Sequence, residues 1–195
     1  MLSVRKLLAG NKLYSQRIAA DMVSKGCFYY VNKCRLRNSW VPHGDEIGFQ
    51  LDDDGRAATG YKGKARDCVV RAISIAEGRD YSDAYRYMDQ ASKQYASTHS
   101  NKVARKIEHG GSSPRNGVFK EVYMEYLKSR GRRYISHGAN RLDLRYRPLG
   151  RVIVRTNKHL VAMLDHVIYD SFDSRWTHFY GEPQLIKAIG YFIRD

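Results

Sequence analysis

Two runs rich in β-branched and aromatic residues near the C-terminus constrain the fold more than any other feature. They flank the dipeptide Asp165-His166, a spacing typical of a β-hairpin with a two-residue turn even though the usual glycine is missing. Counting outward from this turn pairs Leu164 with Val167 and makes His159 and Asp170 diagonal neighbours on one face. The sequence therefore predicts antiparallel strands that bring an imidazole to a carboxylate.

Cys68 stands at the head of a second pattern, an apolar run with helical spacing that extends to Ala76. Asp67 is predicted to be the N-cap residue, which places Cys68 in the first turn. Backbone N–H groups and the helix dipole favour negative charge there, so a thiol loses its proton more easily. The alternative interpretation is a small buried hydrophobic side chain, because free cysteine is among the most buried residue types.

A thiol, an imidazole and a carboxylate together indicate nucleophilic catalysis. In such a site Cys68 is the nucleophile, His159 the general base and Asp170 the group that orients the base. Taken singly, His159 and Asp170 are typical of strand ends at a protein surface. Their combination with a cysteine at a helix start favours a thiol hydrolase.

The stretches that carry this chemistry resemble papain-like cysteine peptidases. The matching letters are Asp-Cys-Val-Val-Arg-Ala at the helix, and His-Leu-Val-Ala-Met-Leu-Asp followed by Ile-Tyr-Asp at the hairpin. The resemblance is to small bacterial and phage members, distantly akin to bacteriocin-processing peptidases, and it spans residues 60–175 or so. It implies a papain-like fold, nucleophile Cys68, base His159 and orienting Asp170. It also implies a protein or peptide substrate whose peptide or isopeptide bond is cleaved through a thioester.

The chain departs from this family's pattern just before the nucleophile. The family usually places a glutamine there, which donates a hydrogen bond to the oxyanion, but residues 60–66 contain none. The backbone N–H of Cys68 and the side chain of Lys62 or Lys64 are the candidate substitutes. Losing one oxyanion donor costs on the order of a hundredfold in rate.

Positive charge is the second strong feature of the sequence. The formal net charge is +14, and residues 1–40 carry eight Lys or Arg against one acid while residues 130–158 carry nine against one. Such fields attract nucleic acid, anionic lipid surfaces or an acidic protein partner, although a solubilising surface is the simpler interpretation. The candidate polyanion-binding residues alternate with apolar residues and Tyr146: Arg141, Arg145 and Arg147.

Cysteine usage and hydropathy predict the compartment. The chain has three cysteines, an odd number, and Cys27 and Cys34 lie seven apart in a strand-like stretch, where their side chains would point to opposite faces. No disulfide framework, metal site or cofactor is therefore expected. The N-terminus lacks the features of a signal peptide, and no apolar run is long enough to span a membrane. We expect a cytoplasmic protein, located in the host cytoplasm or the virion if it is phage-encoded.

The order of the expected elements predicts an α+β fold, with helices first and an antiparallel sheet last. A basic N-terminal appendage is expected over residues 1–58 and a papain-like thiol hydrolase domain over 59–195. Ser82 and Asn116 are the expected caps of two further helices, which are separated by a long polar loop. The expected elements are helices at 12–25, 68–77, 82–95 and 116–130, and strands at 27–31, 47–51, 141–147 and along the hairpin.

Three functions stay open at this level. The leading hypothesis is hydrolysis of an amide bond by Cys68, His159 and Asp170. The same residues also carry acyl transfer to an amine, as in transglutaminase-like enzymes. The charge distribution and the missing glutamine favour the third, a nucleic-acid-binding or virion-associated protein on a catalytically degraded papain-like fold.

Overall fold

The computed structural model describes residues 39–40, 47–141, 149–179 and 182–194 of the chain. The helix expected at 12–25, the strand expected at 27–31, and Cys27, Cys34, Arg145 and Arg147 lie outside these residues. Within them, four α-helices and a seven-stranded sheet form an α+β arrangement, as predicted.

The main sheet has the strand order β1-β2-β6-β5-β4-β9-β3. Its neighbouring strands are antiparallel except for β2 and β6, which run parallel. A separate antiparallel pair is formed by β7 (Trp176–Phe179) and β8 (Glu182–Leu185). The strands of the main sheet are β1 (Ser39–Trp40), β2 (Gly48–Leu51), β3 (Arg132–Arg141), β4 (Arg151–Arg155), β5 (Leu160–Leu164), β6 (Val167–Asp170) and β9 (Lys187–Arg194).

The predicted hairpin is confirmed in its register. Leu164 of β5 pairs with Val167 of β6, and the turn residues Asp165 and His166 have φ values of 44° and 67°. Two successive positive φ angles are what a two-residue hairpin turn of type I′ requires, and Asp and His enter this region more readily than most residues other than glycine. The carboxylate of Asp165 accepts a hydrogen bond of 2.9 Å from the N–H of Gly150, which holds the turn without a glycine in it.

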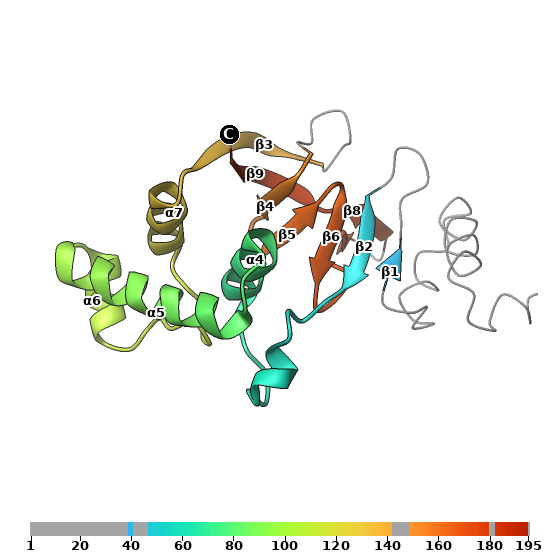
Figure 1. Cartoon of the computed structure of the whole chain (residues 1–195). Coiled ribbons are helices and arrows are strands. Elements are labelled where there is room, and N and C mark those ends of the chain that lie inside the picture. The colour runs from blue at the N-terminus through green and yellow to red at the C-terminus, as the bar shows by residue number, and fades with distance from the viewer. Residues whose placement is uncertain (1–38, 41–46, 142–148, 180–181, 195) are drawn as a thin grey trace, which may run out of the picture.

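Helices α4 and α7 contact this sheet, α5 packs on both of them, and α6 packs on α5. Helix α4 contacts β5, β4 and β6, and Figure 1 shows it in front of the strands, with α5, α6 and α7 on the side away from β1 and β2. As predicted, α4 ends where Gly78, with φ 63°, supplies the left-handed conformation at the helix end. The helices are α4 (Cys68–Glu77), α5 (Tyr81–Thr98), α6 (Lys102–Glu108) and α7 (Lys120–Ser129).

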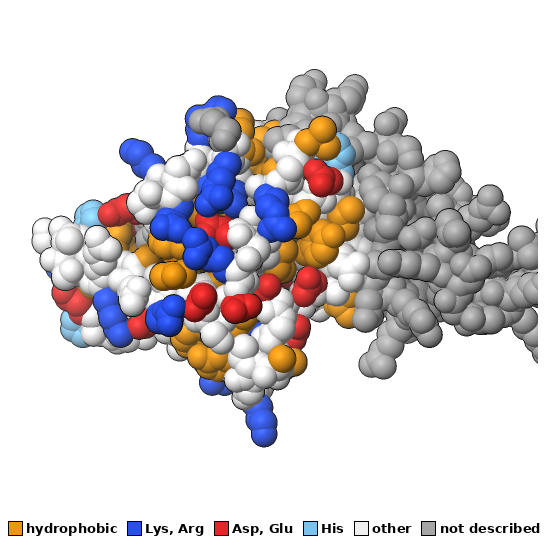
Figure 2. All heavy atoms as spheres, in the orientation of Figure 1, with side chains coloured by type: hydrophobic (Ala, Val, Ile, Leu, Met, Phe, Trp, Pro, Cys, Tyr) orange, Lys and Arg blue, Asp and Glu red, His pale blue; other side chains and the backbone are white. Residues whose placement is uncertain are grey.

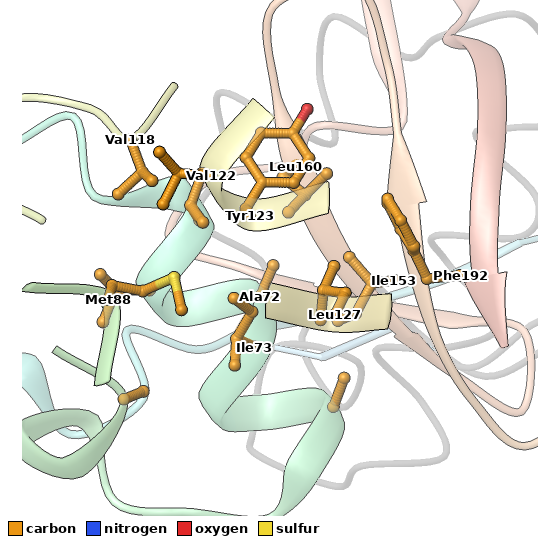
Figure 3. Packing of buried hydrophobic residues seen from close by; sticks show 14 of the residues in the cluster. Ala72, Ile73, Met88, Val118, Val122, Tyr123, Leu127, Ile153, Leu160 and Phe192 are labelled. Carbon is orange, nitrogen blue, oxygen red and sulfur yellow. The ribbon is translucent and has the colours of Figure 1, made fainter. Parts of the chain in front are cut away.

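Helix α4 provides the centre of the main hydrophobic core. Its residue Ile73 is fully buried and belongs to one cluster with Met88 of α5, Leu127 of α7 and Ile153 of β4 (Figure 3). Each such side chain contributes about 1.5 to 3 kcal/mol by leaving water. The other face of the sheet carries a second cluster, composed of Ile47, Val152, Val154, Val161, Met163, Ile168, Ala188 and Tyr191. The main cluster, which includes residues of both α4 and β5, fixes α4, and with it Cys68, against β5.

The helix starts predicted at Ser82 and Asn116 were wrong. Helix α5 begins at Tyr81 with Asp80 as its N-cap residue, and α7 begins at Lys120 after Phe119. Neither of these cap side chains hydrogen-bonds the helix start. Tertiary packing therefore sets these boundaries rather than the local capping preference on which the predictions relied.

The polar loop predicted between the second and third helices contains α6. The side-chain oxygen of Asn101 accepts hydrogen bonds from the N–H groups of Val103 and Ala104, at 2.9 and 3.0 Å. This cap starts a helix of seven residues in which Ala104 is buried. The helix is short and mostly polar, so it lacks the apolar periodicity that would have revealed it.

The segment before residue 58 is not wholly an appendage. Strand β2 forms four residue pairs with β6 inside the main sheet. The short 3₁₀ helix η1 (Arg56–Thr59) supplies Arg56, whose guanidinium forms an ion pair with Asp67 next to the candidate nucleophile. The boundary predicted after residue 58 therefore separates β2 from β6, its neighbour in the sheet, and Arg56 from Asp67, its partner in an ion pair.

Candidate active site

Cys68 is the first residue of α4, as the sequence predicted, and its side chain is half-buried. The N–H groups of the first helical turn have no carbonyl partner within the helix, and the positive end of the helix dipole lies at the thiol. Asp67 is the N-cap residue, but its side chain makes no capping hydrogen bond. That carboxylate is fully buried and forms ion pairs with two arginines instead.

The hairpin brings His159 and Asp170 into direct contact. His159 directly precedes β5, and Asp170 is the last residue of β6. The distance between His159 Nε2 and Asp170 Oδ2 is 2.5 Å. Asp170 is buried and also accepts a hydrogen bond of 2.7 Å from the N–H of Ser171. Its carboxylate is therefore held in place to orient the imidazole ring.

Cys68 and His159 line the same pocket, and the imidazole of His159 and the backbone N–H of Leu160 lie close enough to the thiol to lower its pKa. Since Nε2 of His159 faces Asp170, Nδ1 is the nitrogen that remains for the thiol. The three side chains that the sequence singled out thus form one connected set, joined in the order cysteine, histidine, aspartate.

Electrostatics favour the charged forms of these groups. Burial acts to raise the pKa of Cys68, but the hydrogen bond and charge of His159, the N–H of Leu160 and the charge of Arg71 lower it below its ordinary value. Burial acts to lower the pKa of His159, but Asp170 and Cys68 raise it from 6.5 to about 9. A lowered pKa of the thiol beside a raised pKa of the imidazole favours the pair in which the proton resides on His159.

Behind Asp170 lies a row of buried charges that alternate in sign. Arg71 Nη2 is 3.6 Å from Asp170 Oδ1, and its Nη1 forms an ion pair with Asp67 Oδ1. The other oxygen of Asp67 is 3.0 Å from Arg56 Nε and accepts a hydrogen bond of 2.7 Å from the hydroxyl of Tyr81. Sequence reasoning missed Arg56 and Tyr81. Only the i, i+4 spacing of Asp67 and Arg71 on a helix gave a local signal for this network.

Cys68 and His159 open onto a pocket of about 580 Å³. It lies where the start of α4, the segment that leads into α7 and the turn between β4 and β5 meet. Phe172 lies at its edge, 54% exposed, with its ring centroid 5.3 Å from that of His159. The lining consists of Ala65, Arg66, Cys68, Val69, Arg71, Asn116, Gly117, Val118, Lys120, Tyr123, Arg155, Thr156, Asn157, Lys158, His159, Leu160 and Phe172.

The candidate oxyanion donors Lys62 and Lys64 are not brought to this pocket. Lys62 and Lys64 are exposed and do not line it, because hydrogen bonds from Arg56 to the carbonyl of Gly63 and from Arg115 to that of Lys62 hold their loop elsewhere. Arg141 is the last residue of β3, the edge strand of the sheet. Asn116, which the sequence suggested only as a helix cap, lines the pocket instead.

The part of the chain that the structure describes contains neither a metal-binding cluster nor a membrane-spanning helix. No group of three or more His, Cys, Asp or Glu side chains there is arranged to hold a metal ion. Among the same residues, no helix combines the length and apolar character needed to cross a bilayer.

Comparison with known proteins gave no relative: no family model, no curated protein and no solved structure matches this chain. The case for function therefore depends on the geometry of the site.

Proposed function

We propose that this protein is a papain-like cysteine hydrolase that cleaves peptide or isopeptide bonds through Cys68, His159 and Asp170. One observation carries the proposal. The thiol at the start of α4 shares a pocket with an imidazole that lowers its pKa, and one ring nitrogen of that imidazole is 2.5 Å from a buried carboxylate. This is the arrangement in which a thiol is activated and a leaving group can be protonated.

The reaction would follow from the charged pair. The thiolate of Cys68 attacks the carbonyl carbon, and the carbonyl oxygen becomes an oxyanion. The tetrahedral intermediate collapses when Nδ1 of the His159 imidazolium donates its proton to the leaving amine, and the C–N bond breaks to give a thioester. The neutral imidazole then takes a proton from water, the resulting hydroxide attacks the thioester, and the acid departs as Cys68 is regenerated.

The oxyanion needs donors other than the missing glutamine. The backbone N–H of Cys68, in the first turn of α4, is one candidate. The side-chain amide of Asn116 is another, because it lines the same pocket and is chemically equivalent to a glutamine amide. Lys62 and Lys64 are poorer candidates, since neither lines the pocket.

Thiol reactivity tests the proposal directly. Iodoacetamide at pH 7 should label Cys68 faster than Cys27 or Cys34, and His159→Ala should slow that labelling severely. His109→Ala, which removes an exposed histidine outside the pocket, is the matched control and should leave the rate unchanged. Equal labelling of all three cysteines, or no effect of His159→Ala, would refute the proposal.

A second experiment separates hydrolysis from acyl transfer. A peptide mixture is incubated with the protein in ¹⁸O-labelled water, with and without an added primary amine, and the products are analysed by mass spectrometry. Hydrolysis places one ¹⁸O atom in each new carboxyl group, whereas acyl transfer yields amine adducts. Cys68→Ala should yield neither. Slow alkylation without products, together with salt-sensitive RNA or DNA binding, would favour the polyanion-binding alternative.

A further inference from the structure

The pocket beside Cys68 is lined by basic side chains from several separate segments. Arg66 precedes α4, Lys120 begins α7, Arg155 ends β4, and Lys158 lies in the turn before His159. Among the residues described for this lining there is no Asp or Glu. A fifth cation, Arg71, is compensated by the two carboxylates that it contacts behind the site.

These four charges have no acidic partner in the part of the chain that the structure describes. Arg155 donates a hydrogen bond of 3.2 Å to the neutral hydroxyl of Tyr134, and no carboxylate forms an ion pair with any of the four. Some basic side chains outside the pocket do have acidic neighbours. Figure 2 shows basic side chains interspersed with acidic ones on the visible face, and Arg79, Arg132 and Arg194 all approach Glu77. The pocket therefore gathers four basic side chains, and no carboxylate in its described lining offsets them.

The backbone adds to this positive potential. Both α4 and α7 begin at the pocket, with Cys68 and Lys120 as their first residues. The N-terminus of a helix carries a partial positive charge that favours anions. Side chains and backbone thus act in the same direction, and a neutral or cationic group entering the pocket would gain nothing from either.

Resting on the function proposed above, we propose that the substrate is an acidic peptide segment with Asp or Glu side chains next to the bond that Cys68 attacks. A peptide fits better than a nucleic acid for two reasons. Thiol chemistry at Cys68 requires an acyl carbon, which a nucleic-acid backbone lacks. The lining also offers apolar surface from Val118, Leu160 and Phe172, which suits side chains and methylene groups rather than phosphates.

The test measures how well short peptides protect Cys68 from iodoacetamide. Hexapeptides rich in Glu, Gln or Lys and a single-stranded oligonucleotide are compared at about 50 mM salt and again at higher salt. The Glu peptide should protect at a concentration at least fivefold lower than the Gln peptide, and the advantage should shrink as salt rises. A second measurement compares how fast Cys68 reacts with iodoacetate, an anion, and with neutral iodoacetamide. The ratio of these two alkylation rates is divided by the same ratio measured for N-acetylcysteine.

Two charge-matched variants make the test specific. Arg66→Gln, Lys120→Gln and Lys158→Gln together should abolish the preference for the Glu peptide and lower the iodoacetate ratio about twofold to fivefold for each charge removed. Lys102→Gln, Arg105→Gln and Lys106→Gln, on the exposed side of α6, remove the same charge and should change neither. The single change Lys158→Gln gives a smaller effect should the triple variant fold poorly.

The outcomes separate this inference from the proposed function. Fast alkylation that depends on His159, with equal protection by the Glu and Gln peptides, overturns the acidic-substrate inference alone. Slow alkylation that is independent of His159 overturns the proposed function. Protection by the oligonucleotide at a lower concentration than by the Glu peptide overturns the peptide assignment in favour of nucleic acid.

Discussion

The change Asp170→Asn tests the electrostatics of the site most sharply. The carboxylate is 2.5 Å from Nε2 of His159, and it is the first of the groups that raise the pKa of that histidine from 6.5 to about 9. This rise corresponds to about 3 kcal/mol in favour of the imidazolium. Asparagine keeps the shape of the side chain and removes its charge, so the pKa of His159 should fall by at least one unit, or about 1.4 kcal/mol.

A less stable imidazolium stabilises the thiolate less, so the pKa of Cys68 should rise in the variant. Alkylation by iodoacetamide, followed from pH 4 to pH 10, should reach its midpoint at least about one pH unit higher than in the wild type. At a pH below both midpoints, the rate should then drop about tenfold. His159→Ala should have a larger effect on the same rate. A pH profile that coincides with that of the wild type would refute the reasoning.

The pH dependence of the free energy of unfolding tests the Asp170→Asn change independently. The pKa of His159 is higher in the folded chain, about 9, than its ordinary value of 6.5. The protonated imidazole of His159 therefore contributes its full stabilisation to the folded protein below about pH 6.5. This contribution is lost as the pH rises through about 9. Urea unfolding at pH 6.5 and pH 9 should show a larger loss of stability in the wild type than in Asp170→Asn.

Three further predictions concern the buried charges, the core and the basic surface. Arg71→Met should destabilise the protein by about 3 kcal/mol in urea unfolding, because it removes the cation between two buried carboxylates, and should also slow alkylation of Cys68. Leu127→Ala, at a fully buried position, should cost about 2 to 5 kcal/mol in the same measurement. Changing Arg141, Arg145 and Arg147 together to Ala should weaken heparin or nucleic-acid binding and leave Cys68 alkylation unchanged. Absence of any such binding by the wild type at about 50 mM salt would assign the charge to solubility.

The parts of the site that could be predicted are those whose signals are local. The hairpin register follows from counting outward from Asp165-His166, and the position of Cys68 follows from the apolar period of α4. Each depends on a few neighbouring residues, so a sequence pattern is sufficient. The contact between His159 and Asp170 is a direct consequence of that register.

The parts that could not be predicted depend on residues far apart in the chain. Arg56, Asp67 and Tyr81 meet only because η1, α4 and α5 pack together, and no spacing rule links them. Asp67 looked like a cap because it precedes a helix, but two cations and a hydroxyl bind its carboxylate more strongly than the helix start would. The cationic lining has the same origin, since its basic residues come from segments that meet only in the fold.

The distance along the sequence between Cys68 and His159 determines when the site forms during synthesis. Cys68 precedes His159 by 91 positions, so at about 5 to 20 residues per second the ribosome adds the histidine roughly 5 to 20 s after the cysteine. Helix α4 packs on β5, which is made after all four described helices. The nascent chain thus carries an ordinary, unactivated thiol until β5 and β6 form. On the proposed function, the growing polypeptide is protected from its own nucleophile until the segment from His159 to Asp170 has been made.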